Sequence, residues 1–444
     1  MSSDVQPLSE IANIQGGYAF KSADFGDEGI AVIKIANIQP PLVSLGGVDR
    51  VKPSCVSGLE RFELNDGDIL MAMTGATVGK VGRFKRKERA FLNQRVARIT
   101  ARDGKEFDDF IYAVLSLNGF DKKIENASAG SAQPNISAAG IGSILINKVS
   151  RDDKLSIGKL AKSIDDRITL LRETNATLEA IAQALFKSWF VDFEPVRAKA
   201  AGLEPQGMDA IIAGLFPDGF EKSELGLVPN EWTIERIDNV AEIVKGKSYK
   251  STELTESHHT ALVTLKSFSR GGGFRLDGFK PYTGSYKLAQ VVVPGDLIIA
   301  YTDVTQAAEL IGKPAIVVGV QDYQTLVASL DVGIVRPCSP RVSRQYLYGL
   351  FCTDLFQSHT FAHTSGTTVL HLAKDGVGSY QFACPPQKLV QFFSETTDAL
   401  SKRCQSNIDQ IRTLTQLRET LLPRLISGQL RLPEAEAQIE ALYA

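Results

Sequence analysis

Two runs of basic residues are the parts of this chain whose composition is best suited to binding chemistry. Residues 80–102 contain nine Lys or Arg residues and one acidic residue, Glu88. Residues 245–287, in the other half of the chain, contain eight basic and three acidic residues. Lys neutralises phosphates, and Arg can bind the edge of a guanine with two hydrogen bonds. A basic run can also form an ordinary solvated face, so both interpretations stay open.

Two further motifs have suggestive spacings but lack required residues. Residues 75–81 resemble a phosphate-binding loop, yet three residues instead of four separate the glycines, and Val81 follows the lysine. We therefore expect a tight turn that presents backbone amides and Lys80 to a DNA phosphate. His359 and His363 stand four residues apart, as metal ligands on a helix do, but no acidic or Cys ligand lies at a suitable offset. We expect surface histidines there.

Signatures of catalysis are missing from the sequence. We find no Gly-rich cofactor turn that opens a βαβ unit, no nucleophile elbow and no paired carboxylates of the nuclease type. An enzyme, such as a self-contained methyltransferase or nuclease, would need such motifs. The sequence therefore predicts a chain without catalytic residues and without a bound cofactor or metal.

The composition is that of a globular protein with more than one core. The chain has 444 residues, 43% hydrophobic and 23% charged, so two to three domains are expected. A net charge of −2 argues against a nucleic-acid-binding protein that acts alone, because phosphate neutralisation requires an excess of Lys and Arg. Five scattered Cys residues and the absence of an apolar leader predict a reducing, cytoplasmic location without a membrane span.

The second half of the chain repeats the first. Residues 111–113 return as residues 347–349, and the leucine-rich helical stripe near residue 178 returns near residue 414, with an offset of 236. Earlier in the chain the offset is 229 and then 228, which places loop insertions between matching elements. A duplication of this kind predicts two similar binding domains related by a pseudo-twofold axis, and hence a ligand with two parts.

Each repeat begins with a mixed domain. In the first, short β-type runs occur at residues 30–38, 68–73 and 96–100, with a helix over about 107–117. Apolar residues three to four apart then predict a long helix that Pro195 ends. The predicted boundaries are 1–152 for the first domain, 153–197 for the central helix, 198–231 for a loop-rich connector, 232–386 for the second domain, 387–428 for the distal helix and 429–444 for a C-terminal tail.

The two long helices are expected to pair with each other. Each carries an apolar stripe too long for one small domain to cover, so an antiparallel pair that holds the mixed domains apart is the economical arrangement. The stripes include Ile181 and Thr396, and Ser427-Gly428 supplies the distal stop. Asn175 and Asn407 fall on or beside the stripes, where they either fix the register or lie solvated at the stripe edge.

Several segments resemble the specificity subunits of type I restriction-modification systems. They are residues 185–196 (LFKSWFVDFEPV), residues 421–430 (LLPRLISGQL), residues 17–25 (GYAFKSADF) and residues 131–136 (SAQPNI). Connector residues 207–232 are similar to the same family, so the resemblance covers essentially the whole chain. The second domain departs from the pattern, because residues 368–372 (TVLHL) stand where a Gln-Pro-Asn-Ile motif is expected.

The resemblance implies an α+β fold with two pseudo-repeated target recognition domains separated by two long antiparallel helices. It implies a non-catalytic subunit that binds double-stranded DNA, each domain reading one half of an asymmetric target. The helix pair would space the halves and dock two methyltransferase subunits, which bring S-adenosylmethionine. Restriction motor-nuclease subunits that use ATP and Mg could also join. A two-headed scaffold that joins other proteins without DNA is the alternative.

Candidate residues were chosen for their ability to contact phosphates or base edges. In the first domain they are Lys21, Thr74, Thr77, Lys80, Arg83, Lys85, Arg86, Arg89, Gln94, Arg95, Ser131, Gln133 and Asn135. In the second domain they are Lys247, Tyr249, Lys250, Lys266, Arg270, Arg275, Thr302, Asp303, Thr305, Gln306, Lys313 and Thr367. The expected interface with partner subunits is Phe186, Trp189, Phe190, Phe193, Leu422 and Leu425.

Overall fold

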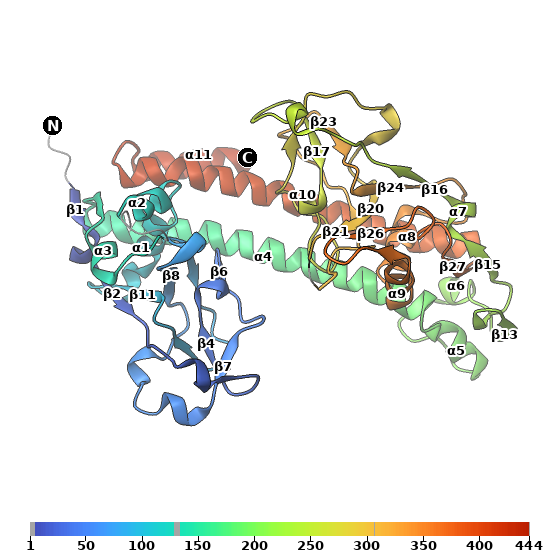
Figure 1. Ribbon diagram of the computed structural model, residues 1–444, viewed down its shortest axis with the longest axis horizontal. Helices are drawn as coiled ribbons and strands as arrows, with labels where there is room; N and C mark the ends of the chain where they lie inside the picture. Colours follow the sequence, from blue (N-terminus) through green and yellow to red (C-terminus); the bar gives the residue numbers. More distant parts are fainter. Residues whose placement is uncertain (1–4, 128–133, 306, 444) are drawn as a thin grey trace. The chain divides into compact units, whose positions relative to one another are not determined.

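The computed structural model describes residues 5–127, 134–305 and 307–443, which form two compact units. The first unit comprises the chain up to Leu171 and from Gln410 onward, and the second comprises Arg172–Asp409. Two 40-residue helices, α4 (Arg151–Phe190) and α10 (Gln387–Ile426), contribute one part to each unit (Figure 1). Each unit thus contains one mixed domain and a segment of both long helices.

The first unit is built on two sheets that share a core. Within its six-stranded sheet the order is β2 (Ala12–Gly16), β11 (Val96–Ala101), β8 (Ile69–Ala72), β9 (Val81–Arg83), β6 (Leu42–Val43) and β5 (Ile38–Gln39). The four-stranded sheet has the order β10 (Ala90–Leu92), β4 (Ile30–Ile33), β7 (Asp49–Val51) and β3 (Phe25–Gly26). The predicted run at residues 30–38 is therefore interrupted, because residues 35–37 form a 3-10 turn between β4 and β5.

Strand β8 shows why this segment of sequence is apolar throughout. Its alternate residues point to opposite faces, as in any strand. Ile69 and Met71 enter a core shared with helix α1 (Asp108–Leu115) and α4, whereas Leu70 and Ala72 enter the core between the two sheets. All four side chains are buried, which explains a continuous apolar run in place of an alternating one.

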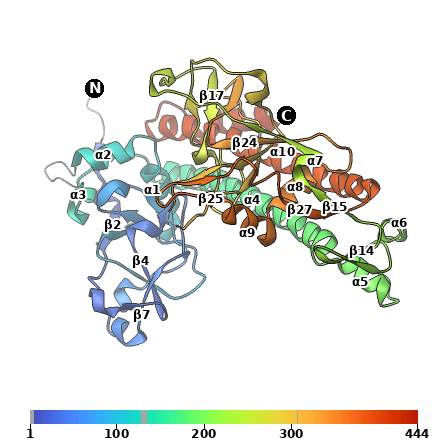
Figure 2. The same cartoon turned by 45° about the vertical axis from the view of Figure 1, so that its right-hand side comes forward.

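Helices cover the first face of this sheet. Helices α1 and α2 (Phe120–Ala127), the short α3 (Ala138–Gly142) and the first part of α4 lie beside it (Figures 1 and 2). Strand β1 (Val5–Pro7) pairs with β12 (Leu145–Asn147) just before α4 begins. The two ends of the first domain are therefore joined to each other at the root of the long helix.

The second unit repeats this construction. One four-stranded sheet has the order β16 (Ala241–Lys245), β24 (Val332–Pro337), β20 (Leu297–Ala300) and β22 (Pro314–Ile316). The other has the order β18 (Lys280–Pro281), β17 (Thr260–Val263), β23 (Thr325–Ala328) and β19 (Val291–Val292). Strand β20 divides its side chains as β8 does, because Leu297 and Ile299 enter one core and Ile298 and Ala300 the other.

Smaller elements complete the second unit. Helices α8 (Arg344–Phe351) and α9 (Asp354–Ala362) follow β24, as α1 and α2 follow β11. A three-stranded sheet of β21 (Thr302–Asp303), β26 (Leu370–Leu372) and β25 (Thr364–Ser365) then precedes β27 (Gln381–Cys384), which pairs with β15 (Thr233–Arg236). The predicted α+β fold with two repeated mixed domains is confirmed.

The long helices pair within each unit, and their pairing is antiparallel. In the first unit Arg418 on α10 binds Asp165 on α4 at 2.6 Å, beside a cluster that includes Ile168 and Leu414. In the second unit the Asn407 amide donates to Asn175 Oδ1 at 2.7 Å. From Asp165 to Asn175 the residue number rises along α4, whereas the partners on α10 fall from Arg418 to Asn407. The two helices therefore run antiparallel, as predicted.

The seam between the helices differs from the predicted stripes at some positions. Ile181 is 50% exposed, and Thr396 is exposed while its neighbour Thr397 is buried. The predicted stripe therefore drifts from the buried face, because 3.6 residues per turn leaves a remainder over so many turns. Asn407 is fully buried, so the solvated alternative is wrong for this residue.

The structure differs from the prediction in one helix boundary and in the content of two segments. Helix α4 ends at Phe190, before Pro195, which instead occupies the first turn of helix α5 (Glu194–Ala200), where its missing N–H is harmless. The connector is more ordered than predicted, with helix α6 (Ala210–Ala213) and a hairpin of β13 (Phe220–Ser223) and β14 (Gly226–Pro229). The expected C-terminal tail contains helix α11 (Leu432–Tyr443). No helix among the described residues combines the length and apolar character that crossing a membrane requires.

Candidate nucleic-acid interface

Four chain segments of the first domain meet in a hydrogen-bonded frame. The backbone N–H of Gln94 donates to Tyr18 O at 2.8 Å, and that of Met73 donates to Arg95 O at 3.0 Å. Ile136 N–H donates to Met73 O at 2.9 Å, next to a bridge between Thr74 and Asn135. We call the residues Tyr18, Thr74, Gln94, Arg95 and Asn135 the first rim.

The side chains of the first rim suit contacts with base edges. Gln94, Arg95 and Asn135 are exposed, and Tyr18 is 37% exposed. Amides of Gln and Asn match the edge of adenine, and the guanidinium of Arg matches guanine. The frame holds their backbones in place, so little conformational freedom would be lost on binding.

Gly17 permits the close approach on which this frame depends. Its neighbour Tyr18 donates from its N–H to Leu92 O at 2.9 Å. A Cβ atom on Gly17 would lie 2.2 Å from Asn93 O, closer than any real contact. Any other residue at this position would therefore push the two segments apart.

The second domain repeats three of these contacts, among them that from Tyr18 N–H to Leu92 O. Lys247 N–H donates to Ala328 O at 2.7 Å, Tyr301 N–H donates to Asp331 O at 2.8 Å, and Leu372 N–H donates to Tyr301 O at 2.9 Å. A Cβ atom on Gly246 would lie 2.0 Å from Ser329 O, as at Gly17. The residues that correspond to the first rim form the second rim, namely Lys247, Thr302, Leu330, Asp331 and His371.

Sequence reasoning missed four of these ten rim residues, namely Tyr18, Leu330, Asp331 and His371. The repeat offset could have found three of them, because Gln94, Arg95 and Asn135 return as Leu330, Asp331 and His371 with an offset of 236. Their types changed between the repeats, and this hid them from a search for similar residues. Strand pairing of Thr302 with His371 now shows that residues 368–372 do occupy the place of the Gln-Pro-Asn-Ile motif.

Much of the basic run at residues 80–102 is neutralised within the first domain. Arg83 binds Asp109 at 2.7 Å and lies over the Tyr112 ring. Arg86 and Arg89 both bind Glu63, at 3.1 and 2.8 Å, and these hydrogen bonds, led by that from Arg89, hold the pKa of the Glu63 carboxyl below its usual range. Arg83 therefore has a structural role, which argues against the predicted DNA contact.

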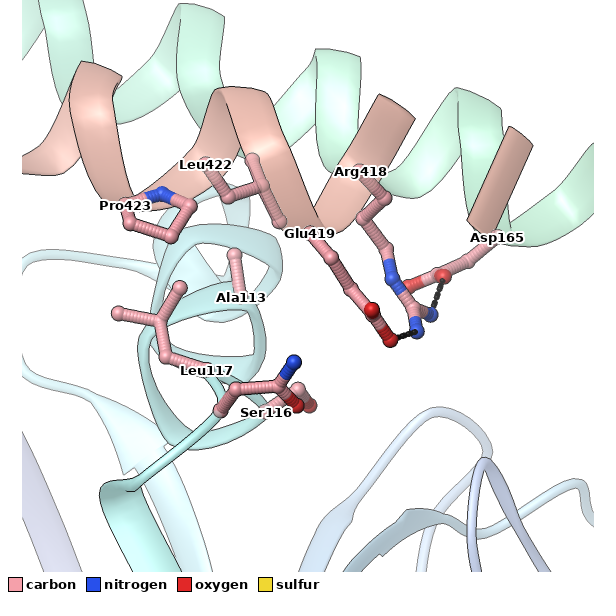
Figure 3. A pocket seen from close by; sticks show the side chains of 9 residues that line it. Ala113, Ser116, Leu117, Asp165, Arg418, Glu419, Leu422 and Pro423 are labelled. Carbon is pink, nitrogen blue, oxygen red and sulfur yellow. Dashed lines mark hydrogen bonds and ion pairs between the residues drawn. The ribbon is translucent and has the colours of Figure 1, made fainter. Parts of the chain in front are cut away.

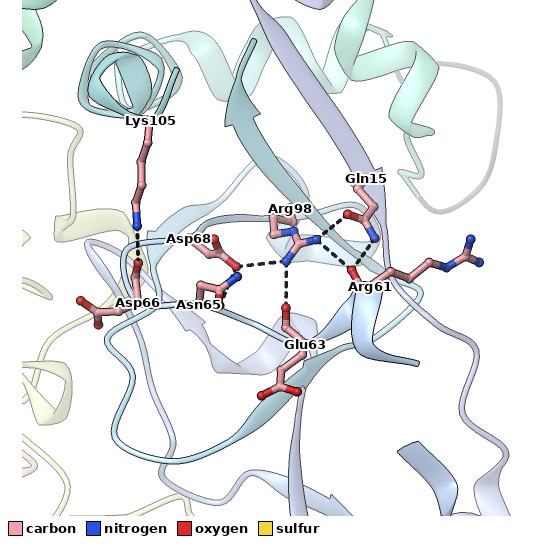
Figure 4. A network of polar contacts seen from close by, with 8 residues as sticks. All are labelled: Gln15, Arg61, Glu63, Asn65, Asp66, Asp68, Arg98 and Lys105. Carbon is pink, nitrogen blue, oxygen red and sulfur yellow. Dashed lines mark hydrogen bonds and ion pairs between the residues drawn. The ribbon is translucent and has the colours of Figure 1, made fainter. Parts of the chain in front are cut away.

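Arg98 belongs to the same run and organises the base of the domain (Figure 4). It donates to the carbonyl oxygens of Arg61 and Glu63, both at 2.8 Å, and to Gln15 Oε1 at 2.6 Å. Asp68 lies 3.3 Å away as its counter-ion. A half-buried guanidinium with this many hydrogen bonds fixes a loop, which argues against a contact with DNA.

Among the other first-domain candidates, Lys21, Lys80 and Lys85 are exposed. The hydroxyl groups of Thr74 and Thr77 are buried and have no hydrogen-bond partner among the described residues. Ser131 and Gln133, with Gln306 of the second domain, lie outside the described residues.

Asp303 and Thr302 were predicted to contact DNA, but both side chains are buried. Asp303 accepts hydrogen bonds from the N–H groups of Leu310 and Ile311 at 2.6 and 2.9 Å. Burial alone would raise its pKa, but hydrogen bonds from Thr305 and from these amides hold the pKa of Asp303 below its ordinary value. Asp303 therefore anchors the loop that follows β21, and its burial argues against a DNA contact by its carboxylate. Thr302 contributes mainly its backbone to the second rim.

The remaining second-domain candidates are divided between paired and exposed side chains. Arg270 binds Glu309 at 3.3 Å, Arg275 binds Asp277, and Tyr249 accepts from Lys280 at 3.0 Å. Thr305 accepts from Glu309 N–H, and Lys313 is half-buried. Exposed side chains are those of Lys250, Lys266 and Thr367.

The predicted partner interface is not an exposed surface. Phe186, Trp189 and Phe190 are at most 7% exposed and pack in the core of the second unit, which partly covers Phe193. Leu422 and Leu425 are buried in the core of the first unit. This burial in the chain's own cores argues against the predicted docking role of these residues.

A small hollow lies where α1 meets the long helices in the first unit (Figure 3). Its lining includes Ala113, Leu117, Leu422 and the ion pair of Arg418 with Asp165. No cluster of three metal-ligating side chains occurs in the described part of the chain. The rings of His359 and His363 are tilted at 32° with their centroids 4.1 Å apart, and His359 Nε2 lies 3.1 Å from Ser379 Oγ, which fixes the ring inside its own domain.

Comparisons with known proteins agree with this architecture. Residues 3–180 match the family of type I restriction modification DNA specificity domains. The chain is 21% identical over 376 residues to the specificity subunit of the type I restriction enzyme HindI from Haemophilus influenzae, covering 72% of this chain and 77% of the relative. It is 22% identical over 347 residues to the MjaIX specificity subunit from Methanocaldococcus jannaschii, covering 77% and 73%.

A solved structure shows the same fold. The crystal structure of the S subunit of a type I restriction-modification system from M. genitalium matches with a TM-score of 0.53 at 12% identity, covering 95% of both chains. Together with the duplicated frame and the matched specificity domain, these comparisons show that the chain is similar to the specificity subunits of type I restriction-modification systems.

Proposed function

We propose that this chain selects a bipartite, asymmetric DNA sequence, with the first rim reading one half and the second rim the other. The observation that carries the proposal is the shared backbone frame with different side chains. In each domain the frame is held by three equivalent hydrogen bonds and a glycine that tolerates no side chain. A constant frame with variable outward side chains is what two readers of different sequences require.

The chemistry of the first rim favours base edges over phosphates. Gln94 and Asn135 can donate and accept at adenine, and Arg95 can bind the two acceptors of guanine. Lys80, exposed on the turn that follows β8, is suited to a phosphate. Since four of the nine cations of the basic run are paired with carboxylates of the same domain, we expect weak binding by the chain alone.

Partners would supply what this chain lacks. We expect two methyltransferase subunits to bring S-adenosylmethionine and additional phosphate contacts, and restriction subunits, where present, to bring ATP and Mg. The continuous helices α4 and α10 are suited to set the distance between the half-sites. We expect the docking surface to include exposed positions of these helices, such as Leu170 and Ile181. The aromatic residues at the end of α4 are buried.

The test is to assemble the chain with methyltransferase subunits and to map the methylated sites across genomic DNA. We expect one sequence with two defined halves and an unread gap. A titration of the chain alone with mixed DNA should show weak binding that falls steeply with salt. Methylation without a two-part sequence, in a complex that assembles normally, would refute the proposal.

A further inference from the structure

The second rim differs from the first in a way that points to a particular base. We propose that Leu330 makes the second domain select a thymine, by packing against the 5-methyl group in the major groove. This inference rests on the proposed function, because it requires the second rim to face base edges. It names a specificity-determining residue and the chemical group that it recognises.

Three backbone hydrogen bonds hold the turn that contains Leu330. Ser329 N–H donates to Val263 O and Val332 N–H donates to Ser329 O, both at 2.9 Å. Asp331 O accepts from Tyr301 N–H at 2.8 Å. Ser329 is fully buried, whereas Leu330 is 40% exposed. The backbone is held by these hydrogen bonds and the leucine side chain is partly exposed, as a preorganised contact should be.

A single exposed leucine needs no explanation, but the loop that follows rim residue Thr302 exposes a second apolar side chain. Val304 is 61% exposed and directly follows Asp303, whose carboxylate anchors the loop. The matching positions of the first domain are Gln94 and Ala76. Where the first domain offers an amide, the second therefore offers an apolar surface.

The neighbouring position strengthens the choice of base. Asp331 occupies the place of Arg95, so a guanidinium that could bind guanine is replaced by a carboxylate. A carboxylate cannot donate to the acceptors of guanine, whereas the 5-methyl group of thymine is the apolar feature of the major groove. Asp331 therefore disfavours guanine, and the contact that favours thymine comes from Leu330 alone.

The experiment replaces thymine by uracil, which removes only the methyl group. Once methylation mapping has defined the target, the assembled complex is titrated with duplexes that carry uracil in one half-site or in the other. We expect the substitution to weaken binding about fourfold in the half-site of the second domain, as the loss of one buried methyl group implies. Leu330→Ala should lower affinity for the thymine duplex and remove the difference between the two duplexes.

Leu288→Ala is the matched control, because Leu288 is 86% exposed in the same unit but lies outside the rim. It should leave the sensitivity to uracil unchanged. A second half-site without thymine on either strand, or a Leu330→Ala complex that still distinguishes thymine from uracil, would overturn the inference. Either result would leave the proposed function intact as long as the complex still reads two halves.

Discussion

The two rims share backbone contacts but differ in side chain at four of their five positions. The first rim presents Gln94 and Arg95 on its turn, and the second presents Leu330 and Asp331 at the equivalent positions. The frame is fixed by N–H groups, carbonyl oxygens and a glycine, none of which depends on the outward side chains. A duplicated domain can therefore change the chemistry of its contacts without changing its fold.

The largest expected effect comes from exchanging the whole first domain, including its rim. Replacement of residues 5–150 by the matching domain of a relative should change one half of the methylated sequence and leave the other half intact. The boundaries keep β1 with its partner β12, and the first domain therefore keeps both of its ends. Several lost base contacts, at about 1–3 kcal/mol each, should reduce affinity for the original half by a factor of roughly a thousand or more. Simultaneous change of both halves would show that the rims do not act independently.

A change in the length of the long helices should alter the number of unread base pairs between the two half-sites. The sequence of each half-site should stay the same. Four residues inserted after Leu171 and four after Asn407 lengthen each helix by about 6 Å, on the order of two base pairs of DNA. The first insertion lies between the helix cluster of the first unit and the Asn175–Asn407 pair, and the second lies next to that pair. Methylation mapping should find the same halves with a wider gap. An unchanged gap with full activity would exclude a spacer role for the helices.

Gly17 and Gly246, which permit the close approach of the rim segments, allow the affinity for each half of the DNA target to be weakened separately. Gly17→Ala and Gly246→Ala should each separate their rim segments, at a cost of about 1–3 kcal/mol in stability. Affinity should fall only for the half read by the altered domain, as measured with duplexes in which one half is randomised. Gly16→Ala is the matched control, because a Cβ atom there has nothing within 4 Å. Equal losses in all three variants would mean that the frame does not position the rim.

Glu63 allows a smaller test of whether ion pairs within the first domain keep Arg86 and Arg89 from contacting DNA phosphates. Glu63→Gln removes the carboxylate that binds Arg86 and Arg89, so more charge becomes available to phosphates. The slope of log affinity against log salt should steepen by up to about 1.8, whereas removal of Lys85, Arg86 and Arg89 together should flatten it by about 0.9 for each lost contact. Glu88→Gln is the control, since its partner is Arg50. No change in either direction would place this cluster away from DNA.

The smallest effect concerns acid sensitivity. Burial, followed by repulsion from His363, lowers the pKa of His359 below its ordinary value of 6.5. His359 therefore binds a proton more readily in the unfolded chain than in the folded one. Its contribution to the free energy of unfolding is fully present above about pH 6.5 and is lost as the pH decreases below this value. Urea unfolding at pH 5.5 and 7.5 should show this loss, and His359→Gln should reduce it. Lys123 stands 236 residues earlier, so the first unit should lack this dependence. A pH dependence that His359→Gln leaves unchanged would assign it to other groups.

The sequence determined the architecture because the signals for it are local and periodic. Residues 30–33, 69–72 and 96–101 form strands, and the long apolar stripes form α4 and α10 as predicted. The internal offset also predicted two similar domains. These features depend on residue spacing along one strand or helix, which a single sequence records.

Tertiary structure alone decided which polar residues are available for binding. The sequence shows Arg86, Arg89 and Glu63 as separate charges 23 to 26 residues apart, and only folding brings them into one cluster. In the same way, Asp303 is polar in sequence but buried by the amides of Leu310 and Ile311. Composition gives the charges of a chain, but their neutralisation depends on contacts between distant segments, and these contacts decide which cations can reach a phosphate.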